Sequence, residues 1–318
     1  MSNVTVLLAE HEIGRTGLKA TNLGIGTSAL GSMPAVYSYE VPREQALATL
    51  RQVFESRITF VDTSNDYGGG TSERLLGQVL KELGGVPEGV LISTKVDPDS
   101  SGDFSGQRVR RSAEESRERL GMDHLPLVFL HDPERTTFEE AVARDGPVPM
   151  LAKLKEDGVI GHVGVAGGPV DLMRSYVATG EFEVLLTHNR YTLLDRSAEG
   201  LIEECAAQHV AVVNAAPFGG GLLARGPASE TKYGYRAAPT AVIDRASAMN
   251  AACSRFGVPL AAAALQFSMR DPRVCSTIVG VTRPERVDEA ISLASVEVPV
   301  QLWDELATFV PPEELWLY

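Results

Sequence analysis

Hydrophobic positions follow two spacings along most of the chain. Short runs of consecutive apolar residues alternate with longer stretches in which apolar residues recur every three or four positions. The first spacing predicts buried parallel strands, and the second predicts amphipathic helices. The helical pattern is clearest within 72–83. The apolar face expected there comprises Leu75, Leu76, Val79, Leu80 and Leu83.

Eight strand and helix pairs follow one another along the chain. The expected strands are 23–26, 58–63, 90–95, 125–131, 162–165, 184–189, 210–215 and 276–280. The helices expected after them are 43–56, 72–83, 107–120, 138–156, 170–178, 197–208, 240–256 and 284–294. Further helices are expected at 260–270 and about 300–309, and a strand pair outside the barrel at about 4–19.

This alternation predicts an α/β protein, a (β/α)₈ TIM barrel with additional helices and an N-terminal β-hairpin, as a single domain over 1–318. A doubly wound sheet usually has fewer strands and a GxGxxG turn after the first one. The sequence contains no such turn. The barrel is therefore the favoured fold.

Charge and cysteine content restrict the partners and the compartment. The net charge of -13 at pH 7 disfavours nucleic acid and anionic membranes, so the expected partner is a small-molecule substrate. Cys205, Cys253 and Cys275 lie far apart and form no CxxC pair, which favours a reducing, cytoplasmic location. No targeting segment and no run of 18 apolar residues is visible. The oligomeric state is left open.

Three consecutive strands end with an ionisable residue. Asp62, Lys95 and His131 each stand at the carboxyl end of a predicted strand. Each is in phase with one strand face, which includes Phe60 for Asp62, Ser93 for Lys95 and Phe129 for His131. Ile58, Leu91 and Leu127 are expected on the same faces. The carboxyl ends of barrel strands converge on one mouth, so these three side chains are expected to meet there. Tyr67 follows Asp62 in a glycine-rich loop that can approach a ligand.

Together these residues suit proton transfer. A phenol with a pKa near 10 is a poor base at neutral pH, and an ammonium within about 4–6 Å lowers that pKa. Lys95 is therefore expected to lower the pKa of Tyr67, with Asp62 keeping the lysine charged and His131 orienting a substrate oxygen. Singly, such residues are more often an ion pair, a scaffold histidine or a half-buried tyrosine. Their conjunction at adjacent strand ends favours catalysis, with no metal ligand in the set.

Six motifs in order along the chain resemble the aldo-keto reductase superfamily. They are VDTSNDYGGGTSERLLGQVL, LISTKVD, LVFLHDPE, GVIGHVGVAGG, NAAPFGGGLLARG and STIVGVTRPERVDEA. The resemblance implies a (β/α)₈ barrel that binds NAD(P)H without a Rossmann domain, with catalytic residues Asp62, Tyr67, Lys95 and His131. It also implies cofactor contacts at Gly26, Thr27, Asp62, Ala166, His188, Asn189, Phe218, Gly219, Gly220, Leu222, Gly280 and Arg286.

Three parts of this cofactor site differ in how well they match the family. The glycine-rich segment 218–222 fits a pyrophosphate loop, in which backbone N–H groups reach phosphate oxygens, although a plain glycine-rich turn is the alternative. The usual Ser-Asn pair after strand five is absent near Gly167. At the adenosine end the family's Lys, Arg and Asn correspond to Gly280, Arg286 and Ala290. Loss of a cation weakens binding of a 2′-phosphate, so NAD is slightly favoured over NADP.

Within the superfamily, HNRYTLLDRSA, AAPFGGGLLARG and KYGYRAAP look most like the aldose 1-dehydrogenase branch of L-fucose and D-threo-aldose dehydrogenases. The resemblance implies oxidation of a cyclic sugar at C1 to the lactone, with Tyr67 as the acid/base. Tyr37, Asp132 and Arg190 are the candidate substrate contacts, because a sugar needs several hydrogen bonds. Each of these three residue types is more often an ordinary surface or capping residue than a substrate contact.

Other functions stay open at this point. The first is a pyridoxal 4-dehydrogenase or a general aldehyde/ketone reductase, and the second is a nicotinamide-sensing regulatory subunit that serves a partner protein. A metal-dependent barrel hydrolase is disfavoured, because the sequence has no HxH or HExxH cluster.

Overall fold

The computed structural model describes residues 8–234 and 236–317. Eight parallel strands close a barrel in the order β12-β3-β4-β5-β6-β7-β8-β9. They are β3 (Leu23–Gly26), β4 (Phe60–Asp62), β5 (Leu91–Val96), β6 (Leu125–His131), β7 (Ile160–Gly167), β8 (Val184–His188), β9 (Ala211–Ala215) and β12 (Val274–Gly280). The predicted TIM barrel is confirmed, with every barrel strand at its predicted place in the chain.

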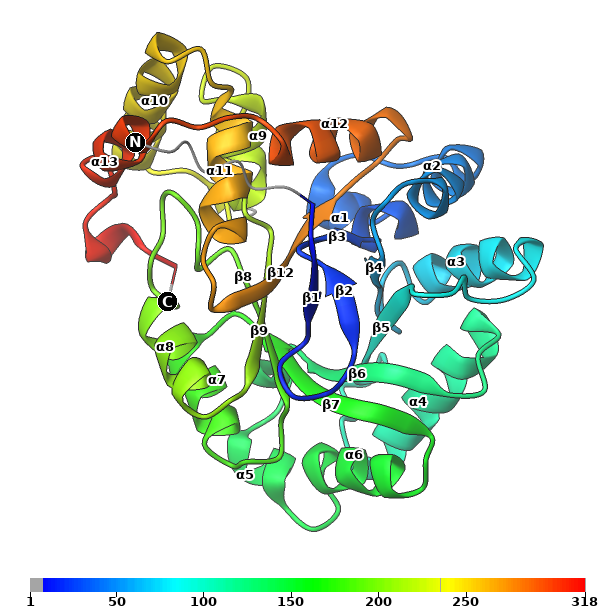
Figure 1. Ribbon diagram of the computed structural model, residues 1–318. Coiled ribbons are helices and arrows are strands. Elements are labelled where there is room, and N and C mark those ends of the chain that lie inside the picture. The colour runs from blue at the N-terminus through cyan, green and yellow to red at the C-terminus, as the bar shows by residue number, and fades with distance from the viewer. Residues whose placement is uncertain (1–7, 235, 318) are drawn as a thin grey trace.

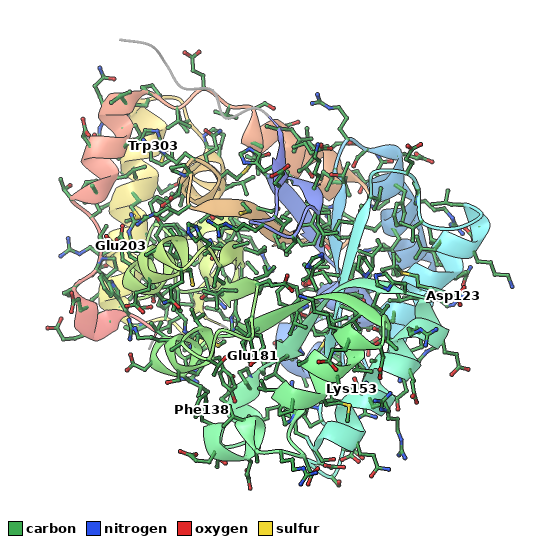
Figure 2. The ribbon with its side chains drawn as sticks, turned by 60° about the horizontal axis from the view of Figure 1, so that its bottom comes forward. Asp123, Phe138, Lys153, Glu181, Glu203 and Trp303 are labelled. Atoms are coloured by element: carbon green, nitrogen blue, oxygen red, sulfur yellow. The ribbon has the colours of Figure 1, made fainter. Side chains whose placement is uncertain are left out.

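Helices surround the barrel (Figure 1). Those that follow the barrel strands are α2 (Arg43–Glu55), α3 (Thr71–Glu82), α4 (Gly106–Leu120), α5 (Phe138–Val142), α6 (Pro147–Glu156), α7 (Val170–Val177), α8 (Glu199–Ala207), α10 (Thr240–Arg255) and α12 (Glu285–Ala294). The two predicted extra helices are α11 (Leu260–Met269) and α13 (Val300–Ala307). Figure 2 shows Asp123, which follows α4, and Glu203 of α8 at opposite sides of this outer layer.

Shorter elements lie between these helices and strands. They are α1 (Pro34–Tyr37), α9 (Leu222–Arg225) and four 3₁₀ helices, Ser28–Gly31, Pro133–Arg135, Gly219–Gly221 and Glu313–Leu315. A small hairpin joins β10 (Lys232–Tyr233) to β11 (Arg236–Ala237). In the part of the chain that the structure describes, no helix is both long and apolar enough to cross a membrane.

The core has two layers, as the alternation of side chains along the strands predicts. Side chains inside the barrel include Phe60, Leu91, Leu127 and Phe129. A larger cluster fills the space between the strands and the helices. Ile58 belongs to this outer cluster, because β4 begins only at Phe60. The inward phase is therefore confirmed for the strand positions nearest the mouth.

Two helical predictions are wrong in detail. The segment 138–156 forms two helices, α5 and α6, because the chain turns sharply at Gly146. A Cβ there would lie 2.3 Å from the carbonyl oxygen of Glu140, and Pro147 then begins α6 with its fixed φ. Leu83 is 50% exposed, because α3 ends one residue before it.

The predicted N-terminal strand pair is present, but it lies a few residues later in the sequence than predicted. Strands β1 (Glu10–Glu12) and β2 (Lys19–Thr21) pair antiparallel, whereas residues 4–7 of the prediction lie outside the described residues. Ile13 and Ala20 pack among the inner side chains of the barrel. Gly14 lies against Ala211, the first residue of β9. The hairpin, seen in front of the strands in Figure 1, thus covers the amino end of the barrel and leaves the carboxyl end for the site.

Candidate active site

A buried ion pair joins the ends of two neighbouring strands. The Nζ atom of Lys95 lies 2.6 Å from Oδ2 of Asp62 and also donates to the carbonyl oxygen of Thr63 at 2.6 Å. The hydroxyl of Ser93 donates to the other carboxylate oxygen of Asp62 at 2.8 Å. Only 1% of the Lys95 side chain and 6% of the Asp62 side chain are exposed. Both charges are therefore compensated by specific partners and fixed in place.

The other two predicted catalytic residues lie next to this pair. The Lys95 ammonium is 4.6 Å from the centre of the half-buried Tyr67 ring. The ring of His131 meets the Tyr67 ring edge to face, with 5.6 Å between their centres. The structure thus brings Asp62, Lys95, Tyr67 and His131 together at the carboxyl ends of β4, β5 and β6.

The net shift of the Tyr67 pKa is upward, not downward as expected from Lys95 alone. Burial raises the pKa of the Tyr67 phenol well above its usual value of 10.0, and the carboxylate of Asp62 raises it further. The carboxylates of Asp132 and Asp97 act in the same direction. At neutral pH Tyr67 is therefore a neutral phenol, the form that donates a proton.

Close backbone packing holds the loop that carries Tyr67. Gly68 has φ +60°, and a Cβ on it would overlap the carbonyl oxygen of Gly31 at 2.0 Å. On the other side, Arg119 donates to the carbonyl oxygen of Asn65 at 2.9 Å and to the fully buried carboxylate of Glu73 at 3.1 Å. These contacts set the position of the phenol from behind, and the sequence alone had pointed only to the glycines.

A carboxylate that sequence reasoning missed lies behind His131. Oδ1 of the fully buried Asp97 is 2.6 Å from Nδ1 of His131. Burial alone would lower the pKa of His131, but the carboxylates of Asp97 and Asp132 outweigh it and raise that pKa. Asp97 stands two residues after Lys95, in the same strand phase. This spacing was the signal that could have identified it.

The predicted substrate contacts form a polar rim around the tetrad. Oδ2 of Asp132 is 3.8 Å from Nε2 of His131, and the hydroxyl of Tyr37 pairs with Ser28 at 2.7 Å. Arg190 donates to the carbonyl oxygen of His188 at 3.2 Å. A Cβ on Gly168 would lie 2.4 Å from the Arg190 guanidinium. The small residue after β7 therefore makes room for this arginine.

Burial lowers the pKa of two nitrogen-containing side chains on this rim, His188 and Arg190. It lowers the pKa of His188 to about 4, against the attraction of Asp132. It also lowers the pKa of Arg190. The rim thus offers a neutral imidazole, a guanidinium and the Asp132 carboxylate as hydrogen-bonding groups.

Some cofactor candidates near the nicotinamide end already have hydrogen-bond partners within the protein, and others have polar atoms without one among the described residues. Thr27 is engaged, because its hydroxyl donates to the carbonyl oxygen of Asp62 at 3.0 Å, and Ala166 lies in the inner barrel layer. Asn189 is available. Its buried Oδ1 has no hydrogen-bond partner among the described residues, and its backbone has φ +60°. A buried acceptor of this kind calls for a donor, and the carboxamide of a nicotinamide supplies one.

The other cofactor candidates lie along the loops after β9 and β12. Gly219, Gly220 and Gly221 have φ +58°, +76° and +107°, a backbone path that favours glycine at every step. Gly280 ends β12 beside Gly26 of β3, and a Cβ on Gly280 would meet nothing within 4 Å. The space is open on the Gly280 side alone, because a Cβ on Gly26 would lie 3.0 Å from the Ile278 side chain.

The arginine at the adenosine end already has a partner. Nη1 of Arg286 lies 2.6 Å from both carboxylate oxygens of Glu289, one turn along α12. Arg283 lies 3.8 Å from Glu285. A 2′-phosphate bound at this point would have to compete with the carboxylates of Glu289 and Glu285 for these arginines.

The four side chains gathered at the mouth of the closed barrel suit an oxidoreductase that acts on CH–OH or carbonyl groups, and the family match assigns that class. The chain matches the aldo/keto reductase family over residues 22–310 and belongs to that family, whose enzymes use NAD(P)H. The predicted family is therefore confirmed.

The chain is similar to three characterised relatives along most of its length. It is 31% identical to D-threo-aldose 1-dehydrogenase of Pseudomonas sp., with 94% of this chain and 96% of the relative covered. It is 32% identical to pyridoxal 4-dehydrogenase of Microbacterium luteolum, with 93% and 96% covered. For L-galactose dehydrogenase of Arabidopsis thaliana the identity is 32%, with 88% and 86% covered.

A solved structure supports the fold. The holo form of aldo-keto reductase AKR11C1 from Bacillus halodurans superposes with a TM-score of 0.78 at 22% identity. The match covers 96% of this chain and 97% of that one.

Proposed function

We propose that the protein oxidises an aldose at C1 to the lactone, with NAD or NADP as the hydride acceptor and a sugar of the L-fucose or D-threo-aldose type as substrate. The observation that carries the proposal is the meeting of Tyr67, Lys95 and His131 at a mouth rimmed by polar groups. D-threo-aldose 1-dehydrogenase and L-galactose dehydrogenase, two of the three relatives, are sugar dehydrogenases, which supports the same substrate class.

The chain's own residues divide the work of the reaction. A bound nicotinamide cofactor would supply the hydride acceptor for the C1 carbon of the sugar. Asn189 would hold its carboxamide, the loop 218–222 its pyrophosphate, and Gly280 its adenosine ribose. As the hydride leaves, the phenolate form of Tyr67 accepts the proton of the C1 hydroxyl, and in the reverse direction the neutral phenol returns that proton to the carbonyl oxygen.

His131 and the rim position the substrate. His131 directs Nε2 to the side of Asp132, where a substrate oxygen between His131 and Tyr67 would receive a hydrogen bond. The groups of Asp132, His188 and Arg190 can bind the remaining hydroxyls. A site that hydrogen-bonds several hydroxyls rejects analogues that lack them, because its buried polar groups are then left unpaired.

The adenosine end favours NAD. Gly280 supplies no cation, and the carboxylate of Glu289 already neutralises Arg286. A 2′-phosphate binds well only to a paired or bidentate cationic clamp. We therefore expect activity with both cofactors and a higher kcat/KM with NAD.

The second candidate is oxidation of pyridoxal or reduction of a general aldehyde or ketone. The identity to pyridoxal 4-dehydrogenase equals that to L-galactose dehydrogenase, which is the observation that favours it. A regulatory subunit that only senses nicotinamide would not need the compensated Asp62 and Lys95 pair, so the geometry favours an enzyme.

A substrate and cofactor panel tests these proposals. The purified protein is incubated with L-fucose, D-arabinose, L-galactose or pyridoxal and with NAD or NADP, and the absorbance of the reduced cofactor is followed. We expect turnover with at least one sugar, faster with NAD. Turnover with pyridoxal alone would select the second candidate, and an absence of turnover with every sugar would refute the aldose proposal.

A further inference from the structure

The carboxylate of Asp97 is built into the back of the candidate site. It is completely buried, and its Oδ1 atom lies 2.6 Å from Nδ1 of His131. Its Oδ2 atom accepts a hydrogen bond from the Ser64 hydroxyl and another, at 3.1 Å, from the backbone N–H of Asp66. Both oxygens therefore have donors, and the His131 ring is held from its Nδ1 side.

Charged and titratable groups face His131 from every neighbouring element. Lys95 and Asp97 come from the end of β5, Tyr67 from the loop after β4, Asp132 and Arg135 from the segment after β6, and His188 from the end of β8. Of the acidic groups, Asp97 is in direct hydrogen-bond contact, whereas Asp132 lies 3.8 Å from Nε2. Arg135 lies 3.5 Å from the Asp97 carboxylate and keeps some of its charge balanced.

Acceptor geometry determines which ring nitrogen carries a proton. A carboxylate only accepts hydrogen bonds, so Nδ1 of His131 must be the donor in this contact. Burial would raise the pKa of Asp97, but His131, Ser64 and Arg135 outweigh it and keep that carboxyl ionised at neutral pH. An ionised partner at 2.6 Å favours a second proton on the ring, at Nε2.

We propose that Asp97 is a positioning residue that holds His131 as an imidazolium, with its Nε2–H directed at the substrate oxygen. This inference rests on the substrate-orienting role of His131 in the proposed function. In that role, the dyad supplies a charged hydrogen-bond donor to the oxygen that gains negative charge during hydride transfer. Tyr67 remains the group that exchanges the proton with that oxygen.

Titration of His131 by nuclear magnetic resonance tests the proposal without substrate. Protein labelled with ¹⁵N-histidine has six imidazoles, and His131 is assigned by the loss of its signals in His131→Gln. We expect the wild-type ring to show the imidazolium pattern at pH 7. In Asp97→Asn the titration midpoint should fall by about one pH unit or more, because the charge is removed and the shape kept.

Glu73 offers a matched control under the same loop. It is also a completely buried carboxylate, and it accepts from Thr94 at 2.6 Å and from Arg119 at 3.1 Å. Glu73→Gln should leave the His131 midpoint in place. An equal shift in both variants, or none in Asp97→Asn, would overturn the proposal. If Asp97→Asn does not fold, a neutral wild-type ring at pH 7 overturns it alone.

The pH dependence of turnover gives a second readout, with a substrate found by the panel. In Asp97→Asn, kcat should fall at least tenfold with KM for the cofactor within about twofold. In the plot of turnover against pH, the part that reflects loss of the His131 proton should move to lower pH. The size of this move should equal the change in the His131 titration midpoint measured by nuclear magnetic resonance. A panel without turnover would refute the proposed function, whereas the titration would still decide the state of His131.

Discussion

Replacement of Lys95 by methionine tests what the buried pair does. Methionine keeps most of the side-chain volume but removes the ammonium that donates to Asp62 and to the carbonyl oxygen of Thr63. Among the described residues, the Asp62 carboxylate, whose side chain is 6% exposed, would then keep the Ser93 hydroxyl as its one side-chain donor. Removal of one partner from a buried ion pair costs about 3–5 kcal/mol, so we expect Lys95→Met to lose about that much stability.

A second substitution separates stability from chemistry. Asp62→Asn in the Lys95→Met background removes the stranded charge and keeps an acceptor for Ser93. The double variant should recover most of that loss, because replacing both members of a buried pair is often close to neutral. Turnover should stay at least a hundredfold below wild type in both variants, the usual loss when proton transfer is impaired.

Urea unfolding followed by circular dichroism, alongside turnover with the best substrate of the panel, measures both quantities. A loss of under about 1 kcal/mol in Lys95→Met would mean that the pair is not a coupled buried charge pair. A double variant that regains wild-type turnover would show that the pair is structural alone. Either result would refute the double role of Asp62 and Lys95 in stability and in proton transfer.

Three further outcomes are expected. Tyr67→Phe should lower kcat at least a hundredfold and leave cofactor affinity within about twofold, measured by fluorescence titration; activity within tenfold would exclude the acid/base role. Gly280→Lys combined with Glu289→Gln, which frees Arg286, should raise kcat/KM with NADP relative to NAD at least tenfold; an unchanged ratio would place the adenosine end elsewhere. Although burial opposes it, His131 lowers the pKa of Asp97 below its usual 3.8, so this contribution to stability is complete above about pH 4 and is lost as pH falls through the lowered value. Asp97→Asn should therefore flatten the acid side of the stability profile, and an unchanged slope would contradict that linkage.

The parts of the fold that could be predicted from sequence are those set by long, periodic patterns. Eight buried strands and their helices repeat one apolar spacing, and the barrel follows from that count and order. The break at Gly146 and the short α1 could not be predicted in this way. The turn at Gly146 depends on the close approach of the Glu140 carbonyl, which no local pattern reports.

In the candidate site, too, strand residues could be placed from the sequence pattern and a loop residue could not. Asp62, Lys95 and His131 could be placed together because strand phase and the common mouth determine where their side chains lie. The place of Tyr67 could not be derived from phase, since it sits in a loop held by Gly31 and by more distant polar groups.

The direction in which the Tyr67 pKa shifts depends on the charges around the ring, and these come together only in the folded barrel. Lys95 is close to the ring, but Asp62 is bound to that lysine and cancels much of its effect. Asp97 and Asp132 then add negative charge around Tyr67 and His131, which raises the pKa of both groups. A mouth that retains protons is ready to donate one to a carbonyl oxygen. Oxidation by the same groups therefore gains from the positive charge that an oxidised nicotinamide brings to this acidic mouth.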